Sequence, residues 1–103
     1  MPLAHKDMFY RAGHLAECGS LIACGQRPAV TATVLSRLDA AGAIDVGRLN
    51  MVEYALGITG HNPHTGHPQN PWDRSRITGG SSSGGAASVA ACLVSATLGS
   101  DTG

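Results

Sequence analysis

The sequence predicts an α/β fold, in which helices alternate with strands that pair in parallel. Three observations support this class. Apolar residues recur at helical spacing over residues 30–41, and this segment lies between short strand-like segments at 3–6 and 43–46. A run of small apolar residues at 86–96 has a helical composition, and residues 97–99 begin like a further strand. With 103 residues, the chain forms at most one small domain.

The first half of the chain contains the clearest elements. Residues 3–6 form the end of a strand within a short, mainly apolar stretch. Residues 11–28 are predicted to be irregular, because three glycines and a proline interrupt them. Residues 30–41 form a helix that Gly42 ends, and residues 43–46 form a short strand directly after it.

A long loop dominates the second half. Residues 50–56 are predicted to form a second helix, which Gly57 ends. Residues 57–80 hold five glycines, three prolines and three histidines, a composition typical of a loop. A loop of this length in a compact domain is usually functional or packed against other parts of the chain. The helix at 86–96 and the strand start at 97–99 complete the prediction.

Composition and charge exclude several classes of function. Seven Lys and Arg residues balance seven Asp and Glu residues, so the sequence predicts neither a nucleic-acid partner nor an anionic membrane surface. No apolar run reaches the roughly 18 residues of a membrane span, and the first ten residues carry charges where a signal peptide is apolar. Cys18, Cys24 and Cys92 lack the spacing of a disulfide framework or zinc site, so we expect free thiols in a cytoplasmic protein.

Seven consecutive Gly and Ser residues at 79–85 have three interpretations. They are typical of a flexible linker, of a phosphate cradle at a helix start, or of a catalytic loop. A Walker loop needs Lys directly after the glycines, where this chain has Ala86, and the G-x-G-x-x-G spacing of a dinucleotide site is absent. The sequence therefore calls for no cofactor, and the stretch alone does not decide between the other interpretations.

Three histidines in the long loop, His61, His64 and His67, are spaced three apart. Three imidazoles can bind zinc. A loop rich in Pro and Gly does not hold such positions on one face, and no carboxylate or cysteine lies close to them in the sequence. The pattern favours an ordinary loop over a metal site, and we expect no metal.

Four blocks of sequence occur in order along the whole chain. They are Pro2–Asp7, Leu49–Ala55, Asn70–Asp73, and the stretch Gly79–Ala91 followed by Leu98–Gly103. Together they closely resemble the amidase-signature family. The resemblance implies a mixed, largely parallel sheet covered by helices. It also implies that residues 1–103 are a partial amidase domain truncated at both ends, because domains of that family run to several hundred residues.

The resemblance implies amide cleavage by a Ser–cis-Ser–Lys triad. Lys6 matches the catalytic lysine, and Ser81 matches the bridging serine that follows a cis peptide bond. The nucleophilic serine is expected two residues beyond Gly103, and Thr102 and Gly103 match part of the oxyanion hole. An amide needs an activated nucleophile and a stabilised oxyanion. A lysine acts as a base only when neutral, so burial or nearby positive charge must lower its pKa.

The resemblance assigns supporting roles less specifically. Ser82 is expected to support Ser81 by hydrogen bonding, but the division of roles among Ser81, Ser82 and Ser83 stays open because any of them is a suitable helix cap. By position in the family, Tyr54 and Ala55 border the acyl pocket. Asp101, next to the oxyanion loop, is interpreted as an orienting carboxylate.

The expected function is that of an amidohydrolase acting on a small-molecule amide. A close variant is the A subunit of an aminoacyl-tRNA amidotransferase, which uses the same triad to release ammonia from glutamine and works with partner subunits. The third interpretation is a non-catalytic, truncated remnant. A homo-oligomer and amidotransferase subunits are both open as assemblies. The isolated chain is expected to be inactive, because the nucleophile lies outside it.

Overall fold

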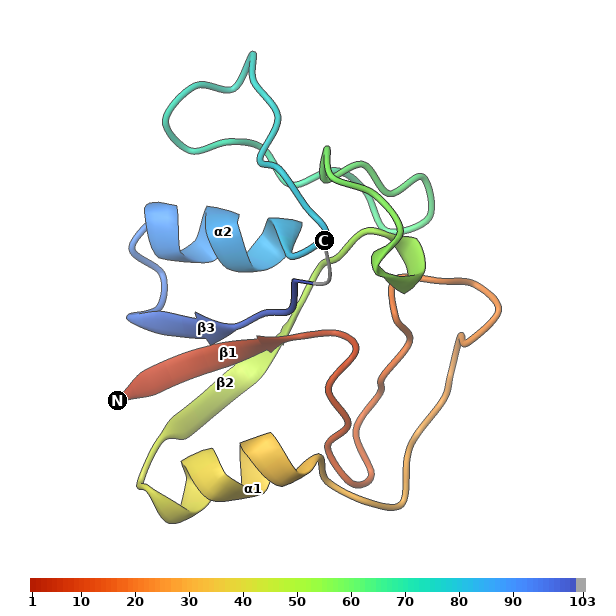
Figure 1. Cartoon of the computed structure of the whole chain (residues 1–103), viewed down its shortest axis with the longest axis vertical. Coiled ribbons are helices and arrows are strands. Elements are labelled where there is room, and N and C mark those ends of the chain that lie inside the picture. Colours follow the sequence, from red (N-terminus) through yellow and green to blue (C-terminus); the bar gives the residue numbers. More distant parts are fainter. Residues whose placement is uncertain (102–103) are drawn as a thin grey trace.

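The computed structural model describes residues 1–101, which contain a small parallel sheet, two α-helices and one short 3-10 helix (Figure 1). The sheet has three strands in the order β2-β1-β3, and both pairs of neighbours are parallel. The α/β class with parallel pairing is therefore confirmed. The elements are β1 (Pro2–Lys6), α1 (Thr33–Ala40), β2 (Ile44–Leu49), η1 (Glu53–Ala55), α2 (Ser83–Ala90) and β3 (Ala96–Leu98).

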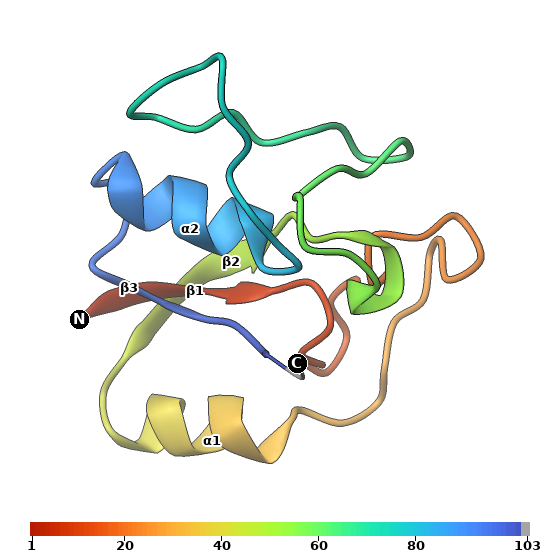
Figure 2. The same cartoon turned by 45° about the horizontal axis from the view of Figure 1, so that its top comes forward.

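The two helices cover opposite faces of the sheet (Figure 2). Helix α2 packs on β1 and β3, while α1 lies on the other side. Successive side chains of a strand point to opposite faces, so neighbouring residues of β1 lie on opposite sides of the sheet. Lys6 ends β1 opposite Leu49 of β2, and His5 lies opposite Leu98 of β3. Lys6 therefore lies at the carboxyl end of the central strand, where the loops after the strands begin.

Strand β2 is longer than the sequence predicted. It runs past Gly47 to Leu49, because one extra residue is accommodated between Asp45 and Arg48 opposite Leu3–His5. Gly47 has a φ of 145°, and its N–H donates a hydrogen bond to Asp45 Oδ1 at 3.1 Å. Gly47 thus forms a bulge inside the strand rather than ending it, which is a common use of glycine in a sheet.

In both α-helices a residue with positive φ lies two positions after the last helical residue. Gly42 follows α1 with a φ of 81°, and its N–H donates to the carbonyl of Asp39, so the predicted stop is confirmed. Helix α2 covers residues 83–90 instead of 86–96. It stops early because Cys92 has a φ of 58° and the N–H of Leu93 turns back to the carbonyl of Ser88.

The predicted helix at 50–56 was wrong. Only the 3-10 turn η1 forms there, and both Tyr54 and Ala55 have positive φ. The N–H of Val52 donates to the carbonyl of Ser81 at 3.0 Å, and the N–H of Tyr54 donates to the carbonyl of Cys18 at 3.0 Å. Because these N–H groups bind distant segments, they cannot donate to the carbonyls four residues earlier, as an α-helix requires.

The interior is part apolar and part polar. Several polar side chains are buried together with the apolar ones, and Asn62 is fully buried among them. The Asn62 amide donates to the carbonyls of Gly19 and Met51, and its side-chain oxygen accepts the N–H groups of His64 and Thr65. Asn62 thereby fixes the loop that begins at residue 57. The buried apolar residues are Leu3, Ala4, Ala16, Leu35, Met51 and Val52.

Candidate active site

The amino group of Lys6 lies between two serine hydroxyls. Its Nζ donates hydrogen bonds to Ser81 Oγ at 2.6 Å and to Ser100 Oγ at 2.8 Å. Lys6 is 2% exposed, which is unusual for lysine. Burial lowers the pKa of Lys6 from its usual value of 10.5, and the negative charge of Asp101 opposes this shift. The neutral amine that a base requires is therefore easier to form here than in an exposed lysine.

Ser81 is held by its backbone from two sides. The carbonyl of Ser81 accepts the N–H of Val52, and the peptide bond between Gly80 and Ser81 is cis, as the family resemblance implied. A Cβ on Gly80 would lie 2.9 Å from the backbone nitrogen of Gly60 and 3.0 Å from Val52 Cγ2. Only glycine fits before Ser81, so the hydroxyl of Ser81 is aimed by a tightly packed backbone.

The start of helix α2 is fixed against the segment after β2. The N–H of Gly84 donates to the carbonyl of Asn50 at 2.9 Å. A Cβ on Gly84 would lie 2.6 Å from the nitrogen and 2.7 Å from the oxygen of Asn50. This close approach explains why helix-disfavouring glycine occurs in the first turn of α2.

Ser82 and Ser83 have different environments. The N–H of Ser100 donates to Ser82 Oγ, and the Ser82 hydroxyl donates to the carbonyl of Ser100, both at 3.2 Å. Ser82 precedes α2 but its side chain makes no capping hydrogen bond. Ser83 Oγ is fully buried and has no hydrogen-bond partner among the described residues. The structure thus gives the three serines three separate sets of contacts.

The predicted acyl-pocket residues Tyr54 and Ala55 do not contact Lys6 by a hydrogen bond within residues 1–101. Tyr54 is 46% exposed, and it joins the site only through the backbone, two residues after Val52. Ala55 shares the same left-handed turn. Thr102 and Gly103, which were expected to form part of the oxyanion hole, lie outside the described residues.

Sequence reasoning missed Ser100. Its hydroxyl contacts Lys6 Nζ and also donates to Met8 Sδ at 3.2 Å, so it directly adjoins the amine. The signal was present, because Ser100 lies in the block Leu98–Gly103 that carries the family resemblance. A hydroxyl beside a lysine is recognised only once β3 is placed next to β1.

The three histidines of the long loop bind other groups. His67 Nδ1 accepts the N–H of Asn62 at 2.9 Å, and the rings of His61 and His67 meet edge to face at 4.8 Å. His64 Nε2 lies 3.2 Å from Glu53 Oε2. Within residues 1–101, no group of three or more His, Cys, Asp or Glu side chains is arranged to hold a metal ion.

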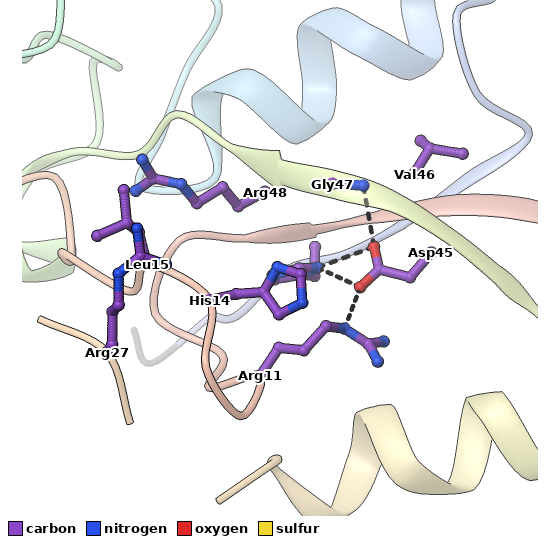
Figure 3. A pocket seen from close by; sticks show the side chains of 9 residues that line it. Arg11, His14, Leu15, Arg27, Asp45, Val46, Gly47 and Arg48 are labelled. Carbon is purple, nitrogen blue, oxygen red and sulfur yellow. Dashed lines mark hydrogen bonds and ion pairs between the residues drawn. The ribbon is translucent and has the colours of Figure 1, made fainter. Parts of the chain in front are cut away.

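A cavity of about 370 Å³ is lined by residues of β1, of β2 and of the segment after β1, and Lys6 is not among them (Figure 3). Asp45 is its best-bonded residue. Arg11 Nε donates to Asp45 Oδ2 at 2.6 Å, and the N–H of Gly47 donates to Oδ1 (Figure 3). His5 Nδ1 lies 3.0 Å from Asp45 Oδ1. Arg11 also forms an ion pair with Asp39. Arg11 thereby links the segment after β1 to both β2 and α1.

The fold and the site together define a class of protein: an α/β domain whose central strand places a buried lysine against a serine from a glycine-rich loop. The chain belongs to the amidase family, whose model, named Amidase, matches residues 1–103. Within the described residues, no helix is long and apolar enough to cross a lipid bilayer.

Two sequence relatives are named as the A subunit of glutamyl-tRNA(Gln) amidotransferase. The chain is 50% identical over 102 residues to the protein from Ectopseudomonas mendocina (strain ymp) and 52% identical over 103 residues to that from Anaeromyxobacter dehalogenans (strain 2CP-C). These matches cover 99% and 100% of this chain but 21% of each relative. The chain therefore spans about a fifth of the length of these relatives.

Solved structures of the same family superimpose closely. The crystal structure of the glutamyl-tRNA(Gln) amidotransferase A subunit from Thermotoga maritima matches with a TM-score of 0.94 at 39% identity, covering 99% of this chain and 22% of that one. Native peptide amidase from Stenotrophomonas maltophilia matches with a TM-score of 0.86 at 38% identity, covering 94% and 21%. The similarity thus extends to enzymes with two different names.

Proposed function

We propose that this chain is part of an amidase domain that hydrolyses a carboxamide through an acyl-enzyme. The observation that carries the proposal is the 2.6 Å hydrogen bond between buried Lys6 and Ser81. Burial lowers the pKa of Lys6, so the neutral amine, which can accept a proton, forms at lower pH than in an exposed lysine. We assign Lys6 as the base, Ser81 as the proton bridge, and a serine outside this chain as the nucleophile.

The proposed reaction has two halves. The nucleophilic hydroxyl attacks the amide carbon and gives its proton to Ser81, while Ser81 gives its own proton to Lys6 Nζ. The carbon–nitrogen bond then breaks, and the proton returns through Ser81 to the leaving amine or ammonia. Water repeats the sequence on the acyl-serine and releases the acid. We assign Thr102 and Gly103 to the oxyanion hole and Tyr54 and Ala55 to the acyl pocket.

The experiment that tests this proposal uses a host chimera, in which this chain replaces the matching region of the Ectopseudomonas mendocina amidotransferase protein. We expect the chimera to hydrolyse glutamine and Lys6→Ala to lose about 10²- to 10⁴-fold of that rate, the usual contribution of a positioned base. Arg37→Ala, on the exposed side of α1, is the matched control and should leave the rate unchanged. An active Lys6→Ala chimera would overturn the assignment. The 103-residue chain alone should show no turnover.

A second candidate is a glutaminase of the amidotransferase type, favoured by the relatives of 50% and 52% identity that carry that name. It implies partner subunits, whereas a simple amidohydrolase implies a monomer or homo-oligomer. Placing this chain also into the Stenotrophomonas maltophilia peptide amidase separates the two. A segment suited to an amidotransferase should restore the amidotransferase host, assayed with its partner subunits, more fully than the peptide amidase host.

We also propose a cytoplasmic location, supported by the cysteines. The spacing of Cys18, Cys24 and Cys92 in the sequence does not match a disulfide framework, and such cysteine usage is typical of a reducing compartment. Fractionation of cells that express a tagged protein would test this. Recovery in the membrane or periplasmic fraction would contradict it.

The host chimera also tests the truncated-remnant interpretation. An active chimera would contradict that interpretation, because a decayed segment would not support catalysis.

A further inference from the structure

We propose that Asp7 is a positioning residue that fixes the Tyr54–Ala55 turn relative to Lys6, and so sets where the acyl group of the substrate lies. Asp7 follows Lys6 directly in the chain, and its side chain is 9% exposed. The inference rests on the proposed function, which assigns Lys6 as the base and Tyr54 to the acyl pocket. It concerns a residue outside the Ser81–Lys6–Ser100 contacts.

Asp7 accepts hydrogen bonds from several segments. Its Oδ1 accepts the N–H of Glu17 at 3.3 Å and Arg48 Nη1 at 2.9 Å, and its Oδ2 accepts the N–H of Gly19 at 3.2 Å. The backbone takes part as well, since the carbonyl of Asp7 accepts the N–H of Cys18. Asp7 therefore holds the 17–20 turn, the segment Glu17–Ser20, by three hydrogen bonds from backbone N–H groups, two to its carboxylate and one to its carbonyl.

The 17–20 turn is hydrogen-bonded in turn to the segments that carry Tyr54 and Asn62. The carbonyl of Cys18 accepts the N–H of Tyr54 at 3.0 Å, and the carbonyl of Gly19 accepts Asn62 Nδ2 at 2.8 Å. The hydroxyl of Ser20 donates to Glu53 Oε1 at 2.7 Å. The 17–20 turn thus lies between Asp7 and the turn that carries Tyr54.

This path from Asp7 to Tyr54 has little conformational freedom. A Cβ on Gly19 would lie 2.6 Å from Asn62 Nδ2 and 2.8 Å from the carbonyl oxygen of Met51, so the 17–20 turn is in close backbone contact with its neighbours. Cys18 has a φ of 52° and Tyr54 a φ of 47°, conformations that non-glycine residues keep only when their surroundings impose them. Loss of the side-chain bonds of Asp7, which leaves only its carbonyl bound to Cys18, should therefore loosen both residues.

Asp45 provides a matched control for Asp7. Its side chain is 8% exposed, it forms an ion pair with Arg11, and it accepts the N–H of Gly47. It lies on β2 and has no hydrogen bond to the 17–20 turn among the described residues. Asp7→Asn and Asp45→Asn each replace one oxygen of a bonded carboxylate by an NH₂ group. Only the side chain at position 7 faces the N–H groups of Glu17 and Gly19.

The test measures both variants in the host chimera at several pH values. We expect Asp7→Asn to raise KM for glutamine about tenfold, as for the loss of one charge-assisted hydrogen bond, and to leave the pH at which Lys6 titrates unchanged. Asp45→Asn should lower thermal stability without changing KM. An unchanged KM in Asp7→Asn, or an equal rise in both variants, would overturn the proposal.

Amide hydrogen exchange supplies a readout that does not depend on activity. In Asp7→Asn the N–H of Tyr54 should exchange faster than in the parent chimera, and in Asp45→Asn it should not. Equal protection of Tyr54 in the parent chimera and Asp7→Asn would refute the positioning role. If Lys6→Ala stays active, the proposed function fails, and the exchange of Tyr54 still decides whether Asp7 fixes this turn.

Discussion

Lys6 and Ser100 are 94 residues apart in the sequence, and Lys6 Nζ donates to Ser100 Oγ at 2.8 Å. The Ser100 hydroxyl in turn donates a hydrogen bond to Met8 Sδ, so the lone pairs of its oxygen face the lysine. The amine is therefore held from one side by Ser100 and from the other by Ser81. We infer that Ser100 aims the Lys6 side chain, whereas Ser81 exchanges the proton with it.

The first prediction concerns Ser100. Ser100→Ala removes one of the two hydroxyls at Lys6 Nζ, so the amine should spend less time aligned with Ser81. We expect kcat in the host chimera to fall about tenfold, the equivalent of one hydrogen bond of about 1.4 kcal/mol. Ser100→Thr keeps the hydroxyl and should retain most of the activity. Steady-state kinetics of the two variants test this, and an equal loss in both would show that shape, not the hydroxyl, matters.

The second prediction is a pH dependence set by Lys6. Burial lowers its pKa below 10.5, so the active, neutral form accumulates as pH rises through the lowered value. The rate should increase with pH and reach its plateau below the pH at which an exposed lysine would titrate. Lys6→Arg keeps the charge but cannot deprotonate, so it should be nearly as damaging as Lys6→Ala. A largely active Lys6→Arg chimera would show that Lys6 is only a cation.

Asp101 offers a control on that pH profile. Its negative charge raises the pKa of Lys6 against the effect of burial. Asp101→Asn removes the charge, so the pKa of Lys6 should fall further and the rising limb of the profile should move to lower pH. The plateau rate is then compared separately, because Asp101 also lies beside the expected oxyanion loop. A limb that does not move would mean that the titrating group is not Lys6.

How much could be predicted differed between local and distant contacts. The strand that ends at Lys6 and the stop at Gly42 follow from local patterns, and the structure confirms both. The helix at 50–56 failed because the N–H groups of Val52 and Tyr54 bind Ser81 and Cys18, which no local pattern shows. The helix prediction failed because the binding partners lie far away in the sequence, not because the segment has a weak helix propensity.

The candidate site shows the same limit. Lys6 and Ser81 could be paired in advance only through the family resemblance, because 75 residues separate them. Ser100 was missed although it lay in the same block of sequence as Asp101. The start of α2 was placed three residues too late, because glycine disfavours helices and its close contact with Asn50 is invisible in sequence.

The third prediction separates the three serines of the Gly/Ser stretch. Ser81→Ala breaks the proton path and should lower kcat strongly. Ser82→Ala removes both bonds to the backbone of Ser100 and should lower kcat less, through misplacement of Ser100. Ser83→Ala removes a buried hydroxyl without a partner among the described residues, so it should leave kcat unchanged and raise stability by about 1 kcal/mol. Kinetics and thermal melts of the three host chimeras test the order, and destabilisation by Ser83→Ala would contradict the structure.

The fourth prediction compares two neighbouring glycines of α2. Alanine favours a helix over glycine by about 1 kcal/mol, so propensity alone predicts that both Gly84→Ala and Gly85→Ala stabilise the protein. The contacts predict different outcomes. The new Cβ at Gly84 would meet the backbone of Asn50 at 2.6 Å, whereas at Gly85 it would meet the movable side-chain oxygen of Thr97 at 3.1 Å.

Backbone cannot rotate away as a side chain can, so Gly84→Ala must push α2 off the segment after β2. Overpacking of this kind costs about 1–3 kcal/mol. Because Ser81 lies just before α2, the same shift should lengthen its contact with Lys6 and lower kcat, while Gly85→Ala should change neither stability nor rate by much. Melting temperatures and kcat of the two host chimeras provide the test. If Gly84→Ala melts as high as Gly85→Ala and keeps its rate, the close approach of Asn50 to α2 does not position the site.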